Sequence, residues 1–163
     1  MRILLACAGL ALAAAAYPAA AAAEPPAITS SLTGAMLYVT DPEREVAFYR
    51  DALGMTLAMT LDHGSKREYM LRFSADRSLA GIILLHDSAA DAPAKLEFGN
   101  AFVRLVLRVS DMDALSARLD GLGIAHAAPR DAGHGYRMMM LTDPEGYRLE
   151  IIQSAPAATE HKP

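Results

Sequence analysis

The chain has 163 residues, a formal net charge of −4 and a single cysteine, Cys7. A mildly acidic chain of this kind offers no basic footprint for nucleic acid or for an anionic membrane surface. With one cysteine it can form no intramolecular disulfide, and it cannot bind a metal through paired cysteines.

The N-terminal segment has the features of a secretory signal peptide (1–23). A positive charge at Arg2 is followed by an apolar stretch, and a run of small residues ends at Ala23. This pattern predicts cleavage near Glu24 and a periplasmic or secreted protein. The apolar part is shorter than the roughly 20 residues that a membrane span needs. A lipoprotein signal with a lipidated Cys7 is disfavoured, because too few residues precede the cysteine.

The rest of the chain carries an internal repeat. Residues 36–41, MLYVTD, recur seventy positions later as residues 106–111, VLRVSD. Each copy is an apolar run of strand-forming residues that leads into the start signal of an amphipathic helix. Two similar halves of one domain are therefore expected.

Helix start and stop signals follow each copy of the repeat. In the first copy, Thr40 and Glu43 have the spacing of a capping box, and Gly54 marks the helix end. In the second copy, Ser110 or Asp111 can cap the helix.

Three further strands are predicted after each helix. They are expected near 55–62, 66–74, 79–86, 124–129, 136–142 and 147–153. A four-stranded sheet with one helix leaves one sheet face uncovered, so the two halves should pair. We therefore predict an α+β fold of two βαβββ modules that pair their sheets around a central cup. The expected parts are a linker (24–31), the two modules (32–87 and 98–153) and a disordered tail (154–163).

Two stretches resemble the vicinal-oxygen-chelate superfamily, which includes glyoxalases, bleomycin-resistance proteins and extradiol dioxygenases. Residues 36–55, with the helix ending FYRDALGM, are similar to the opening strand and helix of that family. Residues 143–152, DPEGYRLEII, are similar to its closing hairpin. The resemblance spans roughly 32–153 and implies the fold. It implies far less about activity, because this fold hosts many chemistries.

The metal enzymes of this family place four metal ligands on the first and last strands of the two halves. By the resemblance, these positions fall on Gly34, on Leu84 (or Ile83, if the register is one residue off), on Arg104 and on Glu150. Only Glu150 can bind a divalent metal, and Arg104 would put a positive charge where the metal would sit. No cofactor is predicted. If a metal is bound, Glu150 is a ligand and nickel, zinc, iron and manganese are the alternatives.

Strand alternation predicts which side chains line the cup. Glu150 is the candidate catalytic residue, and five residues are predicted to bind a ligand: Arg104, Arg148, Tyr38, His86 and Arg108. Two interpretations of Arg104 and Glu150 stay open. They form an ion pair that fills the vacant metal position, or the guanidinium holds an anionic group of a ligand.

The preferred hypothesis is an exported protein that binds a small molecule in the cup without the usual metal. Anionic molecules are among the candidate ligands. One alternative is a divalent-metal-dependent lyase or isomerase resembling lactoylglutathione lyase, with Glu150 as a ligand. Another alternative is a structural domain with a filled cup. Whether the protein is an enzyme stays open. The expected partners are a small molecule and a second copy of the chain, with neither nucleic acid nor a membrane span.

Overall fold

The computed structural model describes residues 29–76 and 78–154. The expected signal peptide, most of the linker and nearly all of the tail lie outside the described residues. Ser154, the first residue of the expected tail, is instead the last residue of the last strand.

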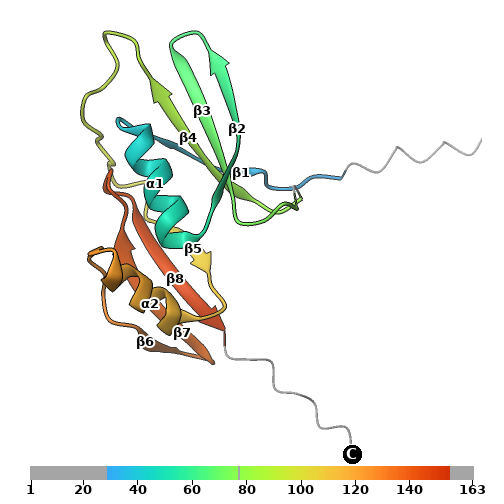
Figure 1. The fold of residues 1–163 in the computed structure, drawn as a ribbon, viewed down its shortest axis with the longest axis vertical. Helices are drawn as coiled ribbons and strands as arrows, with labels where there is room; N and C mark the ends of the chain where they lie inside the picture. The colour runs from blue at the N-terminus through green and yellow to red at the C-terminus, as the bar shows by residue number, and fades with distance from the viewer. Residues whose placement is uncertain (1–28, 77, 155–163) are drawn as a thin grey trace, which may run out of the picture. The chain divides into compact units, whose positions relative to one another are not determined.

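The described chain forms two modules with the same order of elements (Figure 1). The first consists of β1 (Gly34–Tyr38), α1 (Pro42–Leu53), β2 (Thr56–His63), β3 (Lys66–Arg72) and β4 (Gly81–Asp87). The second consists of β5 (Leu105–Arg108), α2 (Met112–Gly121), β6 (Arg130–Gly133), β7 (Tyr136–Thr142) and β8 (Arg148–Ser154). The predicted α+β fold of two βαβββ modules is confirmed. Among the described helices, none is long and apolar enough to cross a membrane.

Each module has one four-stranded mixed sheet. The strand orders are β1-β4-β3-β2 and β5-β8-β7-β6, and the first strand of each module runs parallel to the last. The registers also repeat, because Met36 on β1 pairs with Ile83 on β4 as Val106 on β5 pairs with Glu150 on β8. The sequence repeat is therefore a structural repeat down to single residue pairs.

The predicted strand at 124–129 is wrong, because β6 begins only at Arg130. Before it, a single bridge joins His126 to Leu141. Pro129 separates the two pairings, and a proline has no N–H to give to a neighbouring strand. Regular pairing with β7 therefore starts after the proline, with Arg130 opposite Met138.

The helix caps correct one detail of the sequence analysis. Asp41, rather than Thr40, caps α1, since its side chain accepts the backbone N–H of Arg44 at 3.0 Å. Thr40 instead donates its backbone N–H and its hydroxyl to Glu145 of the other module. Asp111 caps α2, as one of the two predicted candidates.

Alternate residues of each sheet are buried against the helices. The buried strand residues include Leu37, Ile82, Leu84, Leu71, Met139, Leu141, Leu149 and Ile151. They form one core with Phe48, Tyr49 and Ala52 of α1 and with Met112, Leu115 and Leu119 of α2. The two helices are in contact with each other (Figure 1). Helices cover one face of each sheet, and the opposite faces carry the candidate site.

Hydrogen bonds across the junction of the modules tie the turn before β8 to the first module. The Tyr49 hydroxyl on α1 donates to Asp143 at 2.8 Å, and the Tyr147 hydroxyl donates to the carbonyl oxygen of Tyr38 at 2.8 Å. Together with the Thr40–Glu145 bonds, these contacts fix the end of β1 to the start of β8.

Candidate functional site

The sheet faces that no helix covers differ in chemistry, and we name them by their strands. Open face A, on β1–β4, carries Met36, Tyr38, Ile83, Leu85, Met70, Glu68, Met59 and Leu61. Open face B, on β5–β8 and the residues that flank them, carries Arg104, Val106, Arg108, Arg148, Glu150, Ile152, Met140, Tyr136 and Arg130. Face A is largely apolar, whereas face B is apolar and basic.

The central feature of open face B is an ion pair between Arg104 and Glu150. The arginine Nε lies 2.5 Å from the glutamate Oε2, and the two side chains are 39% and 15% exposed. Such a charge-assisted contact is among the stronger polar interactions in proteins. The first interpretation of these residues, an ion pair at the positions of two metal ligands, is the arrangement observed.

The position of the ligand on the first strand is occupied by backbone. Gly34 pairs with Gly81 across the parallel strands β1 and β4. A Cβ added to Gly34 would lie only 2.6 Å from the carbonyl oxygen of Gly81. Real Cβ atoms essentially never approach backbone oxygen so closely. No side chain, and therefore no metal ligand, fits at Gly34 unless the two strands move apart.

The position of the ligand on the fourth strand is Ile83 rather than Leu84. Met36 is the repeat equivalent of Val106, and the residue that pairs with Val106 is Glu150. The residue that pairs with Met36 is Ile83, which lies on open face A. Leu84 is fully buried on the helix side. The prediction of Leu84 was thus wrong by one residue, and its stated alternative, Ile83, is the equivalent position. An isoleucine side chain cannot bind a metal either.

The residues at the four positions do not fit a divalent metal. They offer one carboxylate, and that carboxylate is already paired with a guanidinium. In the described parts of the chain, no group of three or more histidine, cysteine, aspartate or glutamate side chains is arranged to hold a metal ion.

The other arginines of open face B leave positive charge available. Arg108 lies over the ring of Tyr136, 5.8 Å from its centroid, and donates to the hydroxyl of Ser154. Arg130 and Arg148 are exposed, and neither forms an ion pair with another described residue. Glu150 is the one acid that the described strands place on this face. Face B therefore has an excess of guanidinium groups over carboxylates.

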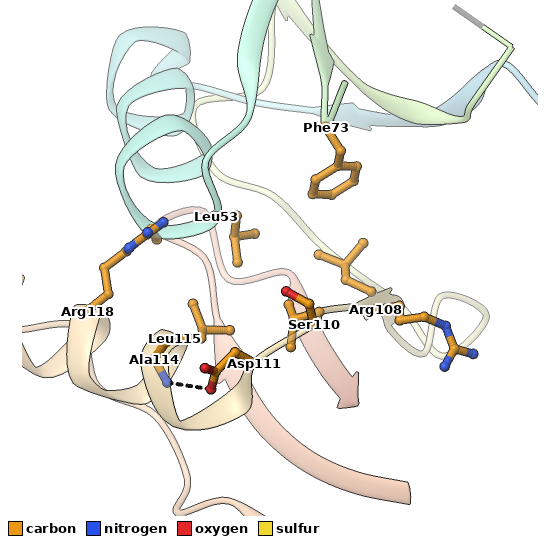
Figure 2. A pocket seen from close by; sticks show the side chains of 11 residues that line it. Leu53, Phe73, Arg108, Ser110, Asp111, Ala114, Leu115 and Arg118 are labelled. Carbon is orange, nitrogen blue, oxygen red and sulfur yellow. Dashed lines mark hydrogen bonds between the residues drawn. The ribbon is translucent and has the colours of Figure 1, made fainter. Parts of the chain in front are cut away.

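Arg108 borders a hollow on the helix side of the sheet, but its guanidinium group does not point into that hollow. This hollow of about 300 Å³ lies between the C-terminal end of α1 and the N-terminal end of α2, where Leu53 and Leu115 line it (Figure 2). The Arg108 guanidinium points away from these two side chains in the same view. Its partners are instead Tyr136 and Ser154 on open face B.

The structure separates two predicted ligand-binding residues from the arginines. Tyr38 lies on open face A and lines a hollow of about 590 Å³ with Met36 and Phe102, among others. His86 was expected in the cup, but alternation along β4 puts it on the face opposite Ile83. Its Nδ1 lies 3.1 Å from the carbonyl oxygen of Val39. The one-residue error in register at Leu84 also placed His86 on the wrong face.

Sequence reasoning missed two residues of open face B. Tyr136 could have been found, since it alternates with Met138 and Met140 along β7. Arg130 is missed because the predicted strand, 124–129, ends one residue before it. Arg104, Arg108, Arg148 and Glu150 are brought together as the alternation predicted.

Comparison with known proteins gives one family. The family model described as the Glyoxalase/Bleomycin resistance protein/Dioxygenase superfamily matches residues 31–151. A lactoylglutathione lyase of Haemophilus influenzae is 31% identical over 124 residues, which are 73% of this chain and 89% of that protein. A probable lactoylglutathione lyase of Synechocystis sp. is 31% identical over 129 residues, 76% of this chain and 95% of that protein.

Solved structures of related fold include an enzyme and a binding protein. Glyoxalase I from Zea mays has a TM-score of 0.68 and 22% identity, covering 77% of this chain and 45% of that chain. The chain thus spans less than half of the maize protein. An antibiotic-binding protein from Streptomyces sp. has a TM-score of 0.59 and 23% identity, covering 80% of this chain and 100% of that chain. At these identities the likeness shows the fold alone.

Proposed function

This chain belongs to the glyoxalase/bleomycin resistance protein/dioxygenase superfamily, and from that premise we propose that it is an exported member that binds a small anionic molecule without a divalent metal. The observation that carries the proposal is the Arg104–Glu150 ion pair. It stands where the metal enzymes of the family have two of their ligands. The guanidinium there disfavours a bound metal ion, because it takes up the one carboxylate that could hold such an ion.

The composition of open face B supports this class of ligand. Exposed Arg104, Arg130 and Arg148 present planar groups with several N–H donors, which suit carboxylate, sulfonate and phosphate groups. Val106 and Ile152, between the arginines on the same face, offer apolar contact. The ligand that fits both features is an anion with an apolar or aromatic body.

Open face A supports a pair of chains as the complete binding unit. Met36 is 52% exposed and Met59 is 41% exposed on this face. Exposed apolar patches of this kind mark interaction sites. We propose that a twofold pair lays face A of each copy on face B of the other. Tyr38 of one copy would then close the ligand site over the arginines of its partner.

A second candidate is the lyase activity named in both curated relatives. Those relatives are 31% identical to this chain over most of its length, which favours the activity as an alternative. In the family's metal enzymes, a bound divalent metal would polarise the substrate. Here Gly34 and Ile83 have no side chain that can bind a metal, and the Glu150 carboxylate is paired with Arg104. The residues present therefore do not support metal-dependent polarisation of a substrate.

Elemental analysis of untagged protein separates the two candidates. The protein, purified without added metal, is analysed by mass spectrometry for nickel, zinc, iron and manganese. It is then assayed for lactoylglutathione formation with each metal added. The proposal predicts that none of these metals is present at a ratio close to one ion per chain, and that added metal does not stimulate lactoylglutathione formation. A tightly bound metal with turnover would establish the lyase instead.

A further inference from the structure

Glu45 is a buried acid without a hydrogen-bond partner. It lies in the first half of α1 and has no exposed surface. Neither of its carboxyl oxygens accepts a hydrogen bond of acceptable geometry. An ionised carboxylate in such a place loses its hydration without compensation, which is costly. Glu43, two residues earlier on the same helix, is exposed and has no such constraint.

The surroundings of Glu45 belong to the junction of the two modules. The turn between β7 and β8 presents Asp143 and Glu145 to Glu45, and Tyr147 directly precedes β8. Asp143 is itself buried, but it accepts the Tyr49 hydroxyl and the backbone N–H groups of Gly146 and Tyr147. The N–H groups of Gly146 and Tyr147 are thus used by Asp143, and the backbone N–H of Glu145 lies near Glu45 without forming a hydrogen bond of good geometry to it.

The groups of its own helix do not neutralise Glu45 either. The Tyr49 hydroxyl is committed to Asp143. Arg44 is half-exposed, and its guanidinium lies 3.6 Å from both Asp41 and Glu145. Arg44, the cation next to Glu45 in the chain, therefore pairs with other acids. A neutral Glu45 fits this environment, whereas an ionised Glu45 faces two further carboxylates.

The acidity of Glu45 reflects this environment. Burial, and then the charge of Asp143, raise the pKa of Glu45 from 4.5 to about 8, against the smaller opposing effects of the Glu145 backbone N–H and of Arg44. Burial also raises the pKa of Asp143, although its hydrogen bonds oppose the rise. Glu45 is thus a group of the junction whose pKa lies well above the ordinary range of a carboxyl group.

We propose that Glu45 acts as a pH-sensitive clasp: while it is protonated and uncharged, α1 packs closely against the turn at 143–146, and when it loses its proton, its charge is repelled by Asp143 and Glu145 and the junction of the modules loosens. The turn continues into Arg148 and Glu150 of open face B, and through Tyr147 it is bonded to Tyr38 on open face A. Loosening the clasp therefore changes how the two open faces are held.

The pH window follows from the direction of the pKa shift. The folded pKa is raised above the unfolded value, so folding stabilises the protonated form. The contribution is fully present below about pH 4.5, falls as the pH rises, and is lost once the pH exceeds about 8. A shift of this size corresponds to a change of up to about three orders of magnitude in the folding equilibrium constant.

The test compares Glu45→Gln with Glu43→Gln in the full chain. Glutamine has the shape of a protonated glutamate and cannot ionise, while Glu43 is an exposed acid on the same helix. Urea unfolding is measured at several values between about pH 5 and about pH 9. Wild type and Glu43→Gln should lose stability with rising pH, and Glu45→Gln should give a nearly flat profile. Equal slopes in all three proteins would overturn the clasp.

Two measurements keep the test decisive if Glu45→Gln folds poorly. In wild type labelled with ¹³C at the glutamate carboxyl carbons, one carboxyl resonance should titrate near pH 8. If all the glutamate carboxyl resonances titrated below about pH 5, the proposal would be refuted. The protection of the Tyr147 amide and its neighbours against hydrogen exchange, expressed in wild type relative to the free-peptide rate at each pH, should fall as Glu45 ionises. Unchanged protection across that range would also refute it.

Discussion

Arg104 and Glu150 are in direct contact on open face B, with the Nε of one 2.5 Å from the Oε2 of the other. Arg104 directly precedes β5 and Glu150 lies on the neighbouring β8. In the metal enzymes of the family, the equivalent side chains would both face a metal ion. In this chain they bind each other, so Glu150 limits the charge that Arg104 can offer to a ligand.

Glu150→Gln should therefore strengthen anion binding. The substitution removes the charge that Arg104 neutralises, and a freed guanidinium adds about 1 kcal/mol, or several-fold, to the affinity for an aromatic carboxylate. The measurement is the dissociation constant of 1-naphthoate, with Glu43→Gln as the control for loss of one acid. A metal-dependent lyase would respond in the opposite way, since it would lose turnover along with its one remaining ligand.

Arg148→Gln should weaken the binding of the same probe. Arg148 is exposed on open face B and pairs with no described acid, so its charge is free to meet an anion. We expect a loss of about 1–2 kcal/mol at low ionic strength, and a smaller effect in high salt because exposed charges are screened. The control is Arg118→Gln on α2, which removes an equal charge elsewhere. Equal losses in both variants would point to a general effect of net charge instead.

Gly34→Ala should destabilise the fold. The new Cβ would lie 2.6 Å from the Gly81 carbonyl oxygen, and strands β1 and β4 would have to separate. Overpacking of this kind costs about 1–3 kcal/mol. Gly121→Ala on α2 is the control, because nothing lies within 4 Å of its Cβ position, and it should be neutral or slightly stabilising. Chemical denaturation measures both, and a neutral Gly34→Ala would show that a side chain does fit there.

Met59→Glu should disrupt the proposed pair of chains. Met59 is exposed on open face A, in register with Met70 on β3. A charge placed there would be buried by the partner at a high cost. Thr60→Glu is the matched control, since Thr60 is exposed on the opposite face of the same strand. Light scattering after size-exclusion chromatography should show pairs for wild type and Thr60→Glu, and single chains for Met59→Glu. A wild type that elutes as single chains would exclude the pairing.

Local patterns in the sequence predicted most of the fold. The repeat at 36–41 and 106–111 predicted the two modules, and the resemblance to the family, together with alternation along β8, grouped Arg104 with Glu150. Pro129 interrupts the pairing with β7, so β6 starts after the predicted strand at 124–129. The choice between Ile83 and Leu84 needed the pairing of β4 with β1, which no local pattern reveals.

Two features of the structure depend on distant contacts. Glu45 has the helical spacing of the buried Phe48 and Tyr49 on α1, but a glutamate is ordinarily expected at the surface. The turn at 143–146 that covers it lies about a hundred positions later in the chain. In the sequence alone, Gly34 looks like an ordinary flexible glycine. In the structure, the Gly81 backbone lies so close that no side chain fits at this position. In both cases the packing partner, and not the residue type, decides the chemistry.

A calorimetric titration of wild type with 1-naphthoate, run with and without a metal chelator, tests the central claim most directly. If open face B is an anion site, binding should be saturable with one site per chain, should weaken in high salt, and should not change when the chelator is present. Binding that disappears with the chelator and returns on addition of nickel or zinc would contradict the account. The Arg104–Glu150 pair would then have to open to admit a metal.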